Sequence, residues 1–89
     1  MSITVEFPHF DISTLPIIPS NWEDVSWHND TCPSFIFGKL HIYIDFANYE
    51  DRECGLANRF HIFETDDFQQ VLESNDWQQV LDFVANYKG

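Results

Sequence analysis

Apolar and polar residues alternate through the middle of the chain. Residues 34–37, "SFIF", and residues 40–46, "LHIYIDF", are two apolar runs separated by Gly38 and Lys39, and the second run has a period of two. This period is typical of half-buried strands, and the glycine-containing break predicts a hairpin between them. After a polar loop, the run "RFHIFE" at residues 59–64 predicts a third strand. We therefore expect an antiparallel meander.

The N-terminal segment predicts a further short strand. Ile3, Val5 and Phe7 alternate with polar residues, and Pro8 ends the pattern because it lacks a backbone donor. Residues 9–29 contain prolines, turn-forming residues and scattered large apolar side chains without a period, so we expect an ordered but irregular segment there.

The last third of the chain changes to a helical period. Its apolar residues fall at spacings of three and four, which predicts two short amphipathic helices. Thr65 is the expected N-cap of the first helix, and Ser74 or Asn75 of the second. The segments "DFQQVLE" at 67–73 and "DWQQVLD" at 76–82 repeat one pattern, which we interpret as two helices packed in the same way. The apolar residues are Phe68, Val71 and Leu72, then Trp77, Val80, Leu81 and Val84.

These elements predict one α+β domain over residues 1–89, with a three- to four-stranded antiparallel meander sheet and two short C-terminal helices packed on one face. Its 89 residues are too few for two ordinary domains. Hydrophobic residues make up 44% of the chain and aromatic residues 17%, which is enough for a modest core.

Charge limits the classes of partner. Fifteen acidic residues against four basic ones give a net charge of -11 at pH 7. Such a charge repels nucleic acid and anionic lipid and favours basic partners. It also destabilises the compact state, and a cationic surface that docks removes this repulsion. We therefore expect a partner protein with a basic surface, and neither direct nucleic-acid nor membrane binding.

The acidic residues concentrate in the second half of the chain, with few basic residues nearby. Exposed Trp and Tyr side chains commonly anchor protein interfaces, so Trp22, Trp27 and Tyr49 are candidate anchors beside the acids. A solvated face that only maintains solubility is the alternative interpretation of the charge. The expected partner-binding acids are Glu50, Asp51, Glu53, Glu64, Asp66, Asp67, Glu73, Asp76 and Asp82.

In size and charge the chain is similar to small acidic phage inhibitors of nucleic-acid enzymes and to immunity proteins that neutralise nuclease toxins. The similarity is one of composition and carries over no individual residue. It implies a non-enzymatic protein that docks on, and inhibits, a basic nucleic-acid-binding protein. A homo-oligomeric or accessory structural subunit, such as a homodimer, is an alternative.

A second alternative is a small metal-binding domain built on "SWHNDTCP", residues 26–33. His28, Asp30 and Cys32 could supply ligands, or Cys32 a nucleophile, but no second close ligand pair exists and the acidic surroundings disfavour a thiolate. We interpret the segment as a turn, because Asn and Asp bond their own backbone. We thus expect no catalytic residues, no metal and no cofactor.

Two further histidines, His41 and His61, fall at polar positions of strands expected to pair. They could lie opposite one another on one face, either as two half-exposed side chains or as a paired proton or metal site. The two cysteines, Cys32 and Cys54, are too few for a disulfide scaffold. With no apparent signal peptide, we expect a soluble cytoplasmic protein with free thiols.

Overall fold

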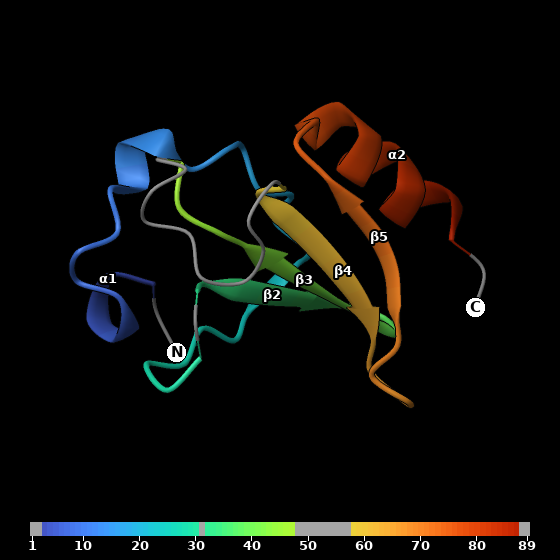
Figure 1. The fold of residues 1–89 in the computed structure, drawn as a ribbon, viewed down its shortest axis with the longest axis horizontal. Coiled ribbons are helices and arrows are strands. Elements are labelled where there is room, and N and C mark those ends of the chain that lie inside the picture. Colours follow the sequence, from blue (N-terminus) through green and yellow to red (C-terminus); the bar gives the residue numbers. More distant parts are fainter. Residues whose placement is uncertain (1–2, 31, 48–57, 88–89) are drawn as a thin grey trace.

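The computed structural model describes residues 3–30, 32–47 and 58–87. Within them, five strands form one antiparallel sheet in the order β1-β2-β3-β4-β5, which is their order along the chain (Figure 1). The strands are β1 (Glu23–Asp24), β2 (Ser34–Phe37), β3 (Leu40–Ile44), β4 (Phe60–Glu64) and β5 (Gln70–Ser74). The helices are α1 (Ile3–Glu6), the 3-10 turn η1 (Ile12–Thr14) and α2 (Trp77–Asn86).

The hairpin predicted around Gly38 and Lys39 is confirmed. β2 and β3 pair with Phe37 opposite Leu40, and Gly38 has a φ of +59°, a conformation that glycine adopts without steric cost. β3 then pairs with β4. The α+β class and the antiparallel meander are therefore confirmed, but the sheet has five strands rather than three or four.

One face of the sheet carries most of its buried apolar side chains. On β3, Leu40, Ile42 and Ile44 are buried on this face, and the register places Phe60 and Ile62 of β4 beside the last two. The two central valines of α2 belong to the same core, and Trp77 at its start contacts Phe60 with ring centroids 5.0 Å apart. We call this the core face.

The opposite face carries aromatic and polar side chains. The register places Tyr43 opposite His61 and His41 opposite Phe63, so the four side chains share one face of β3 and β4. The rings of His41 and Tyr43 stack at 4.3 Å, and Tyr43 meets Phe63 edge-on at 5.7 Å. We call this the aromatic face.

The strand predicted at residues 3–7 is wrong. Ile3 to Glu6 form the single helical turn α1, and the Phe7 amide donates to the Ile3 carbonyl at 2.8 Å. Ile3 and Phe7 are four residues apart, so a helical turn also brings them to one side, where both pack on the core. Val5 points away and is 71% exposed. The Ile3 amide is fixed by the carboxylate of Asp24.

The first of the two predicted C-terminal helices is also wrong. Residues 70–74 form β5, which pairs with β4 through Leu72 opposite Ile62 and Ser74 opposite Phe60. Thr65 therefore caps no helix and lies in the turn between β4 and β5. Hydrogen bonds to β4, across the turn that joins the two strands, replace the bonds within one segment that a helix would have made.

The second C-terminal helix, α2, is confirmed, with Asp76 rather than Ser74 or Asn75 as its N-cap. The Asp76 side chain accepts a hydrogen bond from the Gln78 amide at 3.0 Å. Val80 and Val84 are buried, as the spacing of three and four predicts. α1 and α2 lie at opposite ends of the molecule, with α2 beside β5 (Figure 1).

Candidate protein-binding surface

The acids predicted to bind a partner follow the turn after β4, the edge strand β5 and α2, which lie on one side of the molecule (Figure 1). Glu64 ends β4 and is half-buried, whereas the acids that follow it are exposed. Three predicted acids, Glu50, Asp51 and Glu53, lie outside the described residues. We call the exposed set the acidic flank; it consists of Asp66, Asp67, Glu73, Asp76 and Asp82.

Several of these carboxylates are held by neutral donors. Asp67 accepts from the Gln69 amide at 3.1 Å, and Asp82 accepts from the Gln78 side chain at 3.0 Å. Asp76 is the N-cap of α2. Hydrogen bonds of this kind orient a carboxylate but leave its negative charge in place.

Glu64 accepts a hydrogen bond from the hydroxyl of Tyr87, which follows α2. This bond raises the pKa of Tyr87 to about 12, and desolvation and the negative charge of Glu64 add to the effect. The contact joins the end of β4 to the residue after α2. The negative charges of Asp67 and Asp66 raise the same pKa further.

Two cationic residues, Lys39 and Arg59, lie within the described parts of the chain. Arg59 is directed inward: its Nε donates to the Asp45 carbonyl at 2.9 Å and its Nη2 to the Thr14 carbonyl at 3.0 Å. Lys39 approaches Asp66 at 3.9 Å, but both side chains are largely exposed, so this pair contributes little. The acidic flank therefore keeps most of its negative charge.

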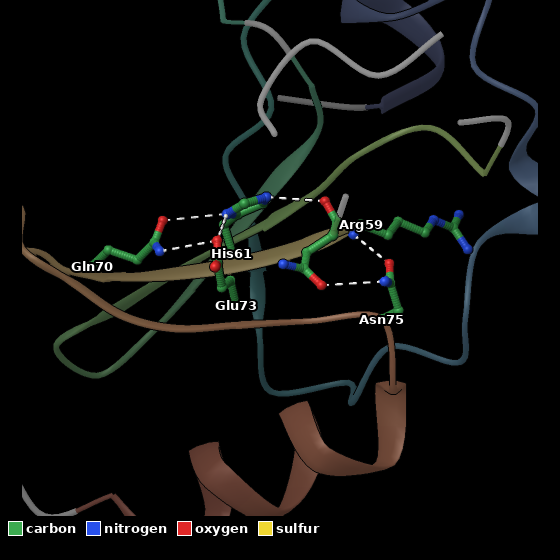
Figure 2. A network of polar contacts seen from close by, with 6 residues as sticks. Arg59, His61, Gln70, Glu73 and Asn75 are labelled. Carbon is green, nitrogen blue, oxygen red and sulfur yellow. Dashed lines mark hydrogen bonds and ion pairs between the residues drawn. The ribbon is translucent and has the colours of Figure 1, made fainter. Parts of the chain in front are cut away.

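A polar network crosses the aromatic face beside the acidic flank (Figure 2). Nδ1 of His61 lies 3.2 Å from the side-chain oxygen of Gln70 and 3.8 Å from Glu73, and Nε2 lies 3.0 Å from the Asn58 carbonyl. Gln70 in turn donates to Glu73 at 3.3 Å. Both ring nitrogens of His61 thus lie within hydrogen-bonding distance of an oxygen.

The same network reaches the entry of α2. The Arg59 amide donates to the side-chain oxygen of Asn75 at 2.8 Å, and the Asn75 amide group donates to Asn58 at 3.2 Å. It therefore ties the start of β4 to the end of β5 (Figure 2). Because His61 is buried and its nitrogens are engaged, we assign the network a structural role.

His41 and His61 share the aromatic face, but each faces a different residue on the neighbouring strand. His41 instead contacts the Ser34 hydroxyl at 2.8 Å through Nε2. Burial lowers the pKa of His41, and the charge of Asp30 opposes this in smaller part. The histidines therefore have separate partners and do not form the paired site that was one interpretation of the sequence.

The turn predicted for residues 26–33 is confirmed in its described part. The Asp30 amide donates to the Trp27 carbonyl at 2.9 Å, and the Ser26 hydroxyl accepts from the Ser34 amide at 3.2 Å, which closes the loop. His28 contacts Glu6 through Nδ1 at 2.8 Å, and Cys32 is buried. Among the described residues, no three His, Cys, Asp or Glu side chains are grouped to hold a metal ion.

The predicted aromatic anchors have different positions. Trp22 is buried and meets Trp77 edge-on at 5.6 Å. It is part of the hydrophobic core, so it is not available as an anchor for a partner. Trp27 is 40% exposed and lies against His28, with ring centroids 4.2 Å apart. Tyr49 lies outside the described residues.

The sequence interpretation missed an exposed aromatic residue at the acidic flank. Its spacing predicts a place on the apolar side of a helix, but Phe68 lies in the turn before β5 and is 58% exposed. Its ring stacks on Phe63 with centroids 4.8 Å apart and an interplanar angle of 12°. The polar run "ETDD", between the strand and Phe68, is the signal that could have indicated a turn.

Comparison with family models, curated proteins and solved structures finds no match for this chain. In the parts of the chain described by the structure, no helix is both long enough and apolar enough to cross a membrane.

Proposed function

We propose that this protein is a non-enzymatic binding protein that docks on a basic surface of another protein and inhibits it by covering that surface. The observation that carries the proposal is the acidic flank, which has five exposed carboxylates along the turn after β4, β5 and α2. Asp67, Asp76 and Asp82 are held by neutral donors, and the pair that Asp66 makes with Lys39 is largely exposed and weak. The expected target is a basic surface that otherwise binds nucleic-acid phosphates, because carboxylates are negatively charged, as phosphates are.

The charge acts most strongly on the rate of encounter. Electrostatic steering raises association rates from about 10⁵–10⁶ to as much as about 10⁸–10⁹ M⁻¹s⁻¹ at low salt. At physiological salt the screening length is about 8 Å, so the steering weakens steeply as salt increases. A net charge of -11 on 89 residues is large enough for this effect.

The experiment is capture by the immobilised protein at low and at physiological salt, followed by mass spectrometry of the retained proteins. The test variant D66N/D67N/D82N neutralises three acids of the flank. The control variant D11N/E23Q/D30N removes the same charge from exposed or half-buried acids elsewhere. The amide oxygen of each asparagine can still accept a hydrogen bond, so the local turns survive.

We expect a basic protein that the parent and the control retain, that the flank variant loses, and whose association rate decreases with salt. Equal retention by the flank variant and the parent would refute the proposal. We also propose that the protein acts in the cytoplasm.

A further inference from the structure

Phe68 has an unusual backbone conformation for an aromatic residue. Its φ is +54°, in the left-handed region that favours glycine, and it is the one non-glycine residue with a positive φ among those described. A buried side chain could compensate for such a conformation by packing, but Phe68 is 58% exposed. The turn therefore holds a large aromatic side chain at the surface.

The exposed Phe68 ring packs against an aromatic residue of the sheet. One face of Phe68 stacks on Phe63, whose own ring meets Tyr43 edge-on. Phe63 lies in the middle of the sheet, on β4, with neighbouring strands on both sides. The Phe63 ring therefore holds the Phe68 ring in place, while more than half of the residue is open to solvent.

Two carboxylates precede this ring in the same turn. The Asp66 side chain is 75% exposed, and Asp67 is exposed and oriented by its bond from the Gln69 amide. The turn is closed by backbone bonds from the Glu64 amide to the Gln69 carbonyl and from the Thr65 amide to the Lys39 carbonyl, each 2.9 Å. An aromatic face and two anionic groups are thus presented by one ordered turn.

We propose that Phe68, Asp66 and Asp67 form a docking site for an arginine side chain of the basic partner. The guanidinium plane lies over the open face of the Phe68 ring, and the carboxylates accept its N–H groups. This inference rests on the proposed function and names the residue type and the place where the partner is held. Arginine fits better than lysine, because its planar group stacks on rings and bonds carboxylates in pairs.

The probes are fluorescently labelled nona-arginine and nona-lysine, which carry equal charge, and the readout is anisotropy at 0.15 M salt. We expect the parent protein to bind nona-arginine more tightly than nona-lysine. F68L keeps an apolar side chain but removes the ring, and we expect it to reduce the arginine preference by about three- to fivefold. F68Y keeps the ring and should keep the preference.

The matched control is Phe37→Leu, a phenylalanine at the end of β2 that is 36% exposed and lies on the core face of the sheet. F37L should leave the preference unchanged. D66N/D67N should weaken the binding of both peptides, because it removes charge as well as the acceptors. Circular dichroism confirms that each variant is folded.

The outcomes separate this inference from the proposed function. If F68L keeps the full arginine preference while D66N/D67N weakens both peptides, the docking site is wrong and the acidic binding surface stands. If neither peptide binds even at low salt, both are wrong. If light scattering shows a dimer that F68L dissociates, the ring binds a second copy of the chain and the arginine site is refuted.

Discussion

The repeated segments at 67–73 and 76–82 offer a direct test of what each aspartate contributes. Asp76 caps α2 by accepting from the Gln78 amide at 3.0 Å. Asp67, at the equivalent place in the other copy, accepts from the Gln69 amide at 3.1 Å, but no helix follows it. We therefore expect D76A to destabilise the protein and D67A to have little effect.

The expected difference in the free energy of unfolding depends on whether a helix follows the aspartate. Replacing an N-cap aspartate with alanine costs about 1 kcal/mol, because a backbone amide of the first turn loses its acceptor. In a domain of this size that corresponds to a decrease of about 4–8 °C in melting temperature. Asp67 orients an exposed turn, and its removal should change the free energy of unfolding by less than about 0.5 kcal/mol.

Urea unfolding monitored by circular dichroism at pH 7 gives both values. Each variant removes one negative charge from the same side of the molecule, so the relief of charge repulsion is similar in both. The difference in the free energy of unfolding between D76A and D67A therefore measures the contribution of the N-cap. Asp76→Asn is the control, because its amide oxygen can still cap α2, and it should be more stable than D76A. Equal destabilisation by D76A and D67A would contradict the assignment of a helix to one copy and a strand to the other.

Three further predictions concern the core and two titrating groups. Ile62→Ala should lower the free energy of unfolding by about 2–5 kcal/mol in urea titrations, because Ile62 is fully buried between β3 and β5; a smaller loss would show that the site collapses. Burial lowers the pKa of His41, so the unfolded chain takes up a proton first as pH falls below about 6.5, and stability should decrease there. Unfolding at pH 7.5 and 5.5 should show a smaller decrease for H41F than for the parent. Ultraviolet titration should show one tyrosine with a pKa of about 12, and E64Q should return the pKa of Tyr87 towards its usual value of 10. An unchanged pKa in E64Q would show that Glu64 is not the group that accepts the Tyr87 hydroxyl proton.

Parts of the sheet could be predicted because the evidence for them is local. The alternation of Leu40, Ile42 and Ile44 and the glycine turn before it lie within eight residues, and both are sufficient to define a hairpin. The period of α2 was equally clear. The N-terminal turn was not, because Ile3 and Phe7 lie on the same side of a strand and of a helical turn. Its contacts, such as the bond from the Ile3 amide to Asp24, are with residues far along the chain.

The candidate surface was predictable in charge but not in detail. Composition alone indicates an acidic protein, and the exposed acids at 66, 67, 73, 76 and 82 follow from their polar character. Burial of Trp22 and exposure of Phe68 could not be predicted, because both are apolar and only packing decides which of them the core accommodates. Trp22 meets Trp77 across a separation of 55 positions along the chain, a contact that no local pattern contains.

The segments "DFQQVLE" and "DWQQVLD" show where the boundary lies. The sequence shows that each segment begins with an aspartate and carries an apolar pair to bury, and in the structure each aspartate accepts from the amide two residues on. The packing of the folded chain makes the first segment β5 and the second α2. The first segment takes its backbone hydrogen-bond partners from β4, whereas the second satisfies its backbone internally as a helix and buries Val80 and Val84 in the core.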